Sequence, residues 1–250
     1  LLAEPETSIG FPDVDEPPLL SINRDFSAPV ILDTERLPGE LERLAEVDSN
    51  AFTRYEALQE LMYQALVGGV ASGQEDPSAV ISAMRGTLRS NALDPAFKGE
   101  ALSLPSEALV GDRMQLVDPD AIHGSRERLR RAIGAALGED LSQAQAAKAA
   151  GGDLSPAAKG VRRLRSVALW LLAGGEPARG AALAKAQYDS ADNMTDRQGA
   201  LAVLSGLDGP ERQAALDDFY ERYRDDSLVL DKWFAVSYTH LRAHETVLDL

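Results

Sequence analysis

From Leu37 onward, apolar residues recur at the three- and four-residue spacing of amphipathic α-helices. Three stripes are clear: Tyr55, Leu58, Leu61, Met62, Ala65 and Leu66; Val80, Ile81, Met84 and Leu88; and Val161, Leu164, Ala168, Leu171 and Leu172. Beside the last stripe, we expect Arg162, Arg163 and Arg165 to turn mostly away from the core. The pattern predicts about nine to eleven short helices joined by tight loops.

Prolines and glycines indicate where these helices begin and end. Four helix starts carry an N-cap acceptor before a proline in the first turn: Asp76, Asp94, Asp118 and Ser155. Thr195 and Gln198 have the spacing of a capping box. We expect three glycine pairs to act as helix stops: Gly68-Gly69, Gly151-Gly152 and Gly174-Gly175.

The predicted fold class is mainly α, in the form of an irregular helical solenoid or multi-helix array. No strict sequence period emerges, so a regular repeat is not supported. The many alanines in residues 132–150 indicate either close contacts between helices or a poorly specified exposed helix. The helical domain is assigned to residues 36–236.

Residues 1–35 differ from the rest, because they contain Pro5, Pro12, Pro17, Pro18 and Pro29, which rule out long helices. Residues 19–24 and 28–33 read as short β-strands. Two strands cannot close a sheet core alone. Either they complete a β-domain whose other strands are missing, or they form a structured leader packed on the helices, and the first interpretation is preferred.

Charge and composition exclude several classes of function. The net charge of −15 argues against a nucleic-acid surface and against binding to an anionic membrane. No apolar run approaches the roughly 18 residues of a membrane span. The absence of cysteine excludes disulfides and thiolate metal sites, and is compatible with a cytoplasmic location. Because the sequence lacks an initiator Met and a signal peptide, we expect its true N-terminus to be missing.

The three histidines do not form a convincing metal site. His240 and His244 have the spacing of two zinc ligands on one helix face, but a zinc-peptidase motif needs Glu at the position of Leu241. Starting at His244 instead, the second ligand position falls on Leu248. His123 has no ligand set nearby and is interpreted as a capping or exposed residue. We therefore predict no catalytic, cofactor-binding or metal-binding residue in this chain.

The remaining charged and aromatic candidates also have structural interpretations. The basic run of Arg126, Arg128, Arg130 and Arg131 could bind phosphate, but a solvated helix face is preferred in so acidic a chain. The carboxylate pairs are sequence neighbours whose side chains diverge by about 100° on a helix; they are Asp217-Asp218 and Asp225-Asp226. Trp170 and Trp233 are expected to anchor helix packing.

Several motifs resemble the bacterial aminopeptidase N family, which consists of zinc-dependent gluzincins. They are Asn23-Arg24-Asp25-Phe26-Ser27-Ala28-Pro29-Val30, Phe52-Thr53-Arg54-Tyr55-Glu56-Ala57, Leu102-Ser103-Leu104-Pro105-Ser106, Asp118-Pro119-Asp120-Ala121-Ile122, Asn193-Met194-Thr195-Asp196 and Leu230-Asp231-Lys232-Trp233-Phe234. The match covers residues 10–236 in consistent order, and residues 1–35 would be the last strands of a β-sandwich domain. None of these motifs is catalytic.

The resemblance implies a four-domain enzyme that removes N-terminal residues from peptides. Its zinc motif, His-Glu-x-x-His with a downstream Glu, and its Gly-Ala-Met-Glu-Asn segment would lie upstream and are absent here. The helical domain would cap the active-site chamber and limit substrate access. Implied partners are the missing catalytic and β domains and a peptide substrate, while this chain by itself is predicted to be inactive.

Residues 237–250 depart from the family pattern, since they resemble a spurious end that recurs on unrelated translated sequences. We expect this tail to be non-native, which removes functional meaning from His240 and His244. The alternative function is a free-standing helical scaffold for protein–protein interaction, because the solenoid pattern carries no catalytic set.

Overall fold

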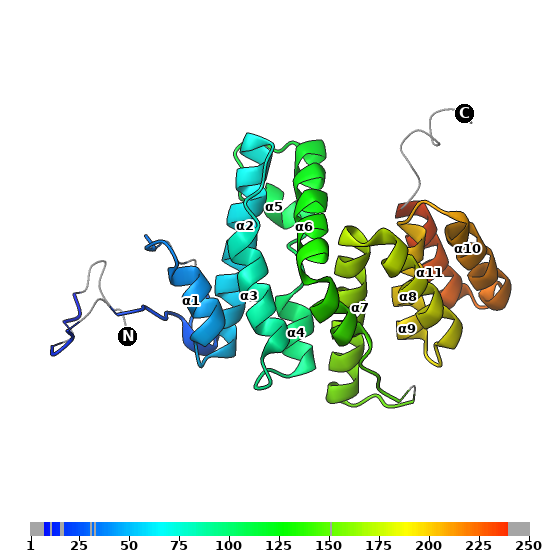
Figure 1. Cartoon of the computed structure of the whole chain (residues 1–250), viewed down its shortest axis with the longest axis horizontal. Helices are drawn as coiled ribbons and strands as arrows, with labels where there is room; N and C mark the ends of the chain where they lie inside the picture. Colours follow the sequence, from blue (N-terminus) through cyan, green and yellow to red (C-terminus); the bar gives the residue numbers. More distant parts are fainter. Residues whose placement is uncertain are drawn as a thin grey trace.

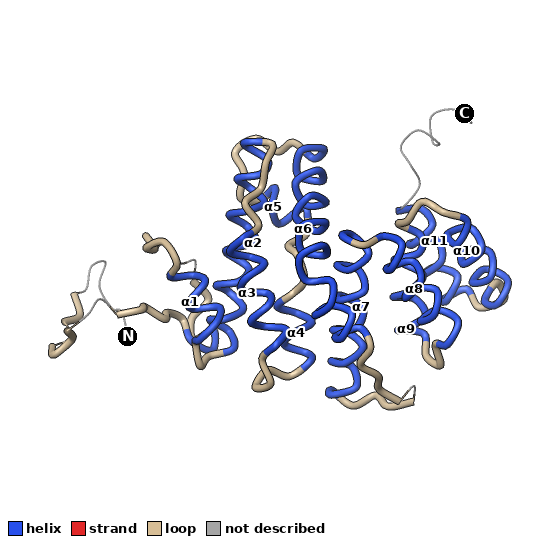
Figure 2. Tube along the Cα trace, viewed as in Figure 1, coloured by secondary structure: helices blue, strands red, loops and turns tan. Residues whose placement is uncertain are grey.

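The computed structural model describes residues 8–10, 12–15, 18–30, 32, 34–150 and 152–239. In these ranges the chain is an array of eleven α-helices that follow one another along its long axis (Figure 1), and Figure 2 shows helices and loops only. The helices are α1 (Glu40–Val47), α2 (Ala51–Ser72), α3 (Ser78–Arg89), α4 (Pro95–Ala101), α5 (Glu107–Gly111), α6 (Pro119–Gln145), α7 (Pro156–Gly175), α8 (Pro177–Ser190), α9 (Met194–Ser205), α10 (Pro210–Tyr223) and α11 (Ser227–Thr239). The predicted helical array is confirmed.

The strands predicted near the N-terminus are not formed in the residues that the structure describes. Residues 19–23 are irregular and lead into a 3-10 turn, η1 (Arg24–Phe26), and residues 28–30 and 32 are irregular as well. Ile31 and Asp33, in the second predicted strand, lie outside the described residues. Leu20 and Val30 are 52% and 54% exposed. A strand needs a neighbouring strand to take its backbone hydrogen bonds, and none lies beside this segment in the described ranges.

Buried apolar side chains form two clusters that meet at α7, as far as the structure describes the chain. The first is built on α1 to α7 and includes Leu58, Met62, Met84, Leu129 and Leu171. The second extends from α7 to α11 and includes Leu169, Ala184, Leu201 and Phe219. Apart from Val161, the residues of the predicted apolar stripes lie in these clusters or pack against them, because each stripe is the face that its helix turns inward.

The central contact of the array, between α6 and α7, depends on glycine. A Cβ on Gly134 would lie 2.3 Å from the carbonyl oxygen of Leu171, and a Cβ on Gly175 would lie 2.0 Å from the backbone nitrogen of Ala135. Real Cβ atoms do not approach backbone so closely, so the two helices touch along their main chains at this point. The close contact is made by these glycines and not by the many alanines of residues 132–150, none of which is fully buried.

The predicted helix boundaries are mostly confirmed. Asp94, Asp118 and Ser155 cap α4, α6 and α7 through their side chains. Asp76 also accepts from the Ser78 backbone N–H at 3.0 Å, one residue before the assigned cap of α3. The capping box at Thr195 is wrong, because Asn193 caps α9 by accepting from the Asp196 N–H at 2.9 Å.

Of the three glycine pairs, only one is confirmed as a helix stop. Gly174-Gly175 ends α7, whereas Gly68-Gly69 lies inside α2, which ends before Gly73 with its φ of 75°. Positive φ is readily adopted by glycine, so Gly73 is the natural stop. Gly151 lies outside the described residues.

Candidate functional site

The residues with metal-binding chemistry do not converge. Across the described ranges, no group of three or more His, Asp or Glu side chains could hold a metal ion. His123 Nδ1 lies 2.8 Å from Glu107 Oε1, and both side chains are exposed. His240 and His244 lie outside the described residues.

Carboxylates of the pairs Asp217-Asp218 and Asp225-Asp226 accept hydrogen bonds that stabilise the surrounding helices. Asp218 Oδ2 accepts hydrogen bonds from the Tyr188 hydroxyl at 2.9 Å and from Arg222 at 2.6 Å. Burial alone would raise the pKa of Asp218, but these two hydrogen bonds and the charge of Arg222 outweigh it and lower the pKa. Asp217 pairs with Gln213, and Asp226 Oδ1 accepts from the Leu228 N–H at the start of α11.

Arg126 and Arg130 of the basic run on α6 are half-buried, so the interpretation as a solvated helix face is wrong for these two, whereas Arg128 and Arg131 are exposed, as that interpretation expects. Arg130 donates to the Trp170 carbonyl at 3.0 Å and to Glu127 at 3.0 Å, and burial lowers its pKa. Arg126 donates to the Pro105 carbonyl, and the two guanidinium groups lie 5.0 and 4.4 Å from the Trp170 ring centroid. Trp170 thus anchors packing, as expected.

Arg128 of the same run connects α6 to the loop between α2 and α3. Its guanidinium donates to both carboxylate oxygens of Glu75, at 2.7 and 2.8 Å. The Glu75 side chain is only 6% exposed. The planar guanidinium of Arg128 makes two parallel bonds to one carboxylate. Together with the contacts of Arg126 and Arg130, this attaches neighbouring elements to α6.

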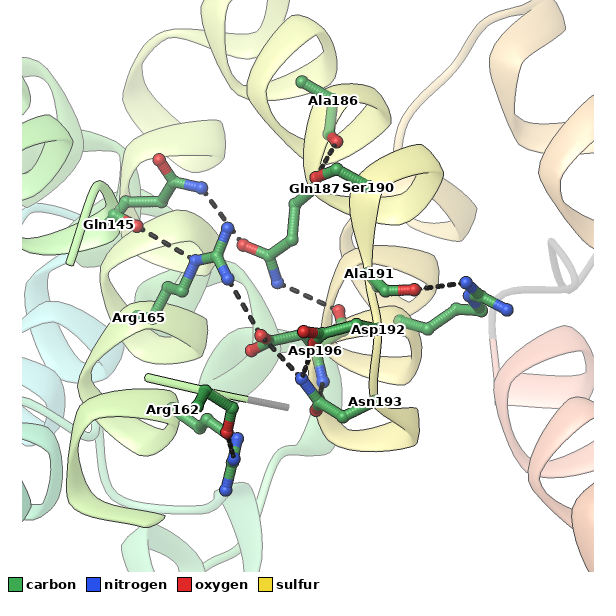
Figure 3. A network of polar contacts seen from close by, with 12 residues as sticks. Gln145, Arg162, Arg165, Ala186, Gln187, Ser190, Ala191, Asp192, Asn193 and Asp196 are labelled. Atoms are coloured by element: carbon green, nitrogen blue, oxygen red, sulfur yellow. Dashed lines mark hydrogen bonds and ion pairs between the residues drawn. The ribbon is translucent and has the colours of Figure 1, made fainter. Parts of the chain in front are cut away.

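A buried polar network lies where α7 meets α8 and α9 (Figure 3). At its centre Arg165 Nη1 donates to Asp196 Oδ2 at 2.9 Å, and the two side chains are 10% and 5% exposed. Arg165 Nε also donates to the backbone oxygen of Gln145, the last residue of α6, at 3.1 Å. One guanidinium thereby connects three helices.

Two amide side chains complete this network (Figure 3). Gln145 Nε2 donates to Gln187 Oε1 at 3.0 Å, and Gln187 Nε2 donates to the backbone oxygen of Asp196 at 2.9 Å. Asn193 Nδ2 donates to Asp196 Oδ2 at 3.0 Å while Asn193 caps α9. The family-like motif at residues 193–196 is therefore a cap joined to a buried ion pair.

The prediction that the arginines of α7 face away from the core is wrong for Arg162 and Arg165. Both are buried, and Arg162 Nη2 donates to the carbonyls of Ala150 and Asp153 at 2.6 and 2.7 Å. Arg163 is exposed, as predicted. A signal was present: Arg165 lies four residues after Val161 and three before Ala168, which places it on the apolar face.

Another family-like motif, at residues 230–234, attaches α11 to α10. Trp233 Nε1 donates to the Leu216 carbonyl of α10 at 2.8 Å. Its ring contacts the rings of Tyr220 and Phe234, at centroid distances of 5.3 and 5.2 Å. The expected packing role of Trp233 is confirmed, and no reactive group accompanies it in the described part of the chain.

One open groove lies between α6, α7, α8 and the loop before α10, and encloses about 780 Å³. Its walls carry small residues, including Gly174 and Ala181. Charges of both signs border it, among them Arg131, Lys185 and Glu211. The groove has the volume of a ligand site, but its lining provides no convergent set of polar groups of one character.

None of the described helices is long and apolar enough to cross a membrane.

Comparisons with known proteins point to one family. The family model described as "Domain of unknown function (DUF3458_C) ARM repeats" matches residues 39–249. Aminopeptidase N of Caulobacter vibrioides is 34% identical over 240 residues, and aminopeptidase N of Escherichia coli strain K12 is 30% identical over 259 residues. These matches cover 94% and 100% of this chain, but 28% and 30% of the relatives.

A structural comparison agrees. The crystal structure of Legionella pneumophila aminopeptidase A, in complex with aspartic acid, matches with a TM-score of 0.76 and 25% sequence identity. The match covers 90% of this chain and 28% of that one. The chain thus spans less than a third of the length of the relatives it matches. The resemblance to aminopeptidase N that the sequence motifs indicated is confirmed.

Proposed function

The chain belongs to the DUF3458_C family of ARM-repeat domains, and on that basis we propose that it is the non-catalytic helical part of a zinc-dependent aminopeptidase N. The whole protein would remove N-terminal residues from peptides. The observation that carries this proposal is the match to aminopeptidases N over 94% and 100% of the chain. The alternative of a free-standing scaffold is not favoured, because the same similarity accounts for nearly every residue.

Zinc is implied for the parent enzyme, but the described residues do not fit it. A catalytic zinc needs three protein ligands and an open position, and these ranges bring no such group together. We therefore assign zinc binding to parts of the parent outside this chain. When bound there, the metal would activate water for attack on the peptide bond.

The helical array would cap the active-site chamber and restrict access to it. A cover must keep its shape, and this array is reinforced by the buried pair Arg165–Asp196 and by the two-bond contact of the exposed Arg128 with Glu75. Such a cover would admit peptides and unfolded ends while excluding folded proteins. Its partners would be the catalytic and β domains of the same polypeptide, in a cytoplasmic enzyme.

A chimera tests the capping role. Residues 39–236 of this chain would replace the corresponding region of the Caulobacter vibrioides aminopeptidase N, with a second version lacking that region as comparison. We expect the chimera to hydrolyse an alanine anilide and to leave the N-terminus of a folded protein intact. The shortened version should attack both. Equal exclusion of the folded protein by both versions would refute the capping role.

A further inference from the structure

The segment before α1 contains a concentration of left-handed backbone. Asn23, Asp25 and Phe26 have φ values of 54°, 57° and 51°, and the only other non-glycine residue with positive φ in the described ranges is Asp13. Asn and Asp tolerate this conformation, whereas a bulky residue such as Phe26 seldom adopts it. Such backbone persists only where the surroundings hold it in place.

The turn is held from within by hydrogen bonds. Asn23 Oδ1 accepts from the Ala28 backbone N–H at 2.9 Å, and the Asn23 carbonyl accepts from the Phe26 N–H at 3.1 Å. The Arg24 carbonyl accepts from the Ser27 N–H at 3.2 Å. Three consecutive amides are therefore bonded inside an eight-residue stretch, residues 21–28, which we call the strap.

The strap is also docked on the corner between α1 and α2, beside α1 in Figure 1. Asp25 and Asn50 form a reciprocal pair, in which the Asp25 backbone N–H donates to Asn50 Oδ1 at 3.2 Å and Asn50 Nδ2 donates to Asp25 Oδ1 at 2.6 Å. Arg24 donates to Asp48 at 3.1 Å and to Ser49 at 2.8 Å. The side chains of both Arg24 and Asp25 thus form hydrogen bonds with the corner between α1 and α2.

Asn50 is also the N-cap of α2. Its Oδ1 accepts from the Thr53 backbone N–H at 3.1 Å. The atom that caps the helix is therefore the atom that binds the Asp25 N–H. The strap and α2 share one hydrogen-bond acceptor, Asn50 Oδ1, so the position of the strap is coupled to the start of α2.

We propose that the strap is a conformational lock, closed by the Asp25–Asn50 pair, that fixes the chain preceding α1 in one direction on the N-terminus of α2. The lock opens without unfolding the array, since its contacts are hydrogen bonds and an ion pair, together with one ring contact, between the exposed Phe26 and Phe52 at a centroid distance of 5.4 Å. It is independent of the capping role, because it requires only contacts within this chain.

Amide hydrogen exchange on the whole chain, followed by mass spectrometry, tests the lock. Asn50→Asp keeps an N-cap acceptor of equal rank for α2, but removes the amide donor and opposes two carboxylates. We expect exchange in residues 25–28 to accelerate at least about tenfold, as for loss of one charge-assisted hydrogen bond. Exchange in residues 57–66 of α2 should be unchanged. No acceleration in residues 25–28 would overturn the proposal.

Two further variants separate the lock from the helix cap. Asp25→Ala leaves Asn50 in place as the cap and should accelerate exchange in the strap to a similar extent. Combining Asp25→Asn with Asn50→Asp reverses the direction of the side-chain hydrogen bond and should restore slow exchange. Failure of Asp25→Ala to release the strap, or of the double variant to restore it, would overturn the assignment of this pair.

Trypsin gives an independent readout, because Arg24 is itself a cleavage site. In the docked strap its side chain is bound to Asp48 and Ser49, whereas Lys148 lies exposed in the loop after α6 and serves as an internal control. We expect cleavage after Arg24, relative to cleavage after Lys148, to be slow in the natural chain and fast in Asn50→Asp. Equal ratios in the two proteins would contradict the lock.

Discussion

Arg165 and Asp196 place opposite charges inside the array, at the junction of its two cores. An ion removed from water loses several kcal/mol of hydration, which its partner and further hydrogen bonds must offset. Here Arg165 also binds the Gln145 carbonyl, and Asp196 accepts from Asn193. Asp196 Oδ1 is buried without a hydrogen-bond partner, so the offset rests on the bonds to Oδ2. These bonds form only when α6, α7 and α9 are correctly arranged, so the pair selects one arrangement of the helices.

Removing one member of this pair should be costly. Asp196→Ala leaves the Arg165 guanidinium buried without its anion, and we expect a loss of about 3–5 kcal/mol in the free energy of unfolding. Urea denaturation measures it. The matched control is Glu100→Ala, which removes the exposed partner of Arg163 at 3.4 Å and should cost less than about 1 kcal/mol. Similar losses in the two variants would contradict a buried structural pair.

Asp48 should make the corner between α1 and α2 sensitive to acid. Burial favours a higher pKa for Asp48, but hydrogen bonds from Ser21 and the Asn50 backbone and the charge of Arg24 prevail, and its pKa is lowered from 3.8. A lowered pKa contributes stability that is present above pH 3.8 and is lost as the pH falls through the folded value.

Stability measured across this acid range should therefore decline less in Asp48→Asn than in the natural chain. The variant has no carboxylate to protonate at this position. Parallel declines in the two proteins would show that Asp48 does not carry the effect.

The helices themselves are fixed by local signals together with close packing. Apolar stripes, N-cap side chains and prolines act within a few residues, which is why α2, α3, α4, α6 and α7 could be predicted from the sequence. The strands could not, because β-propensity in residues 19–33 is realised only beside a partner strand. The spacing of Arg165 places it on the apolar face of α7, but its charged partner Asp196 lies thirty-one residues later, and no local pattern identifies that partner.

The α6–α7 crossing gives a prediction at this scale. Gly134→Ala places a methyl group against the α7 backbone, and we expect a loss of about 1–3 kcal/mol, since packed helices must separate. Gly68→Ala is the control, because nothing lies within 4 Å of its added Cβ inside α2. There alanine should stabilise by up to about 1 kcal/mol. Thermal unfolding compares the two, and equal effects would exclude the close contact.

The whole molecule exposes apolar side chains at both ends of the array. Leu20 and Val30 lie at the N-terminal end, and Leu228 and Phe234, which are 78% and 53% exposed, lie on α11 at the other. Arrays of stacked helices need polar outer faces at their ends to remain soluble. In the candidate site, the polar groups stabilise the array, and no set of them converges for catalysis in the described ranges.

These ends should make the chain self-associate despite its net charge of −15. Light scattering after size-exclusion chromatography should show a mass that rises with concentration. The double variant Leu228→Ser and Phe234→Ser should reduce this rise, because it removes exposed apolar surface and changes no residue of the two core clusters. A monodisperse monomer with cooperative unfolding at all concentrations would count against the prediction.

We propose that this chain contributes structure to a zinc aminopeptidase without performing its reaction. The most direct measurement is hydrolysis of an alanine anilide by the purified 250-residue chain in the presence of zinc. We predict no hydrolysis above the rate in buffer, because the described residues bring no zinc-binding group together. Turnover that depends on zinc and disappears with a chelator would contradict the account.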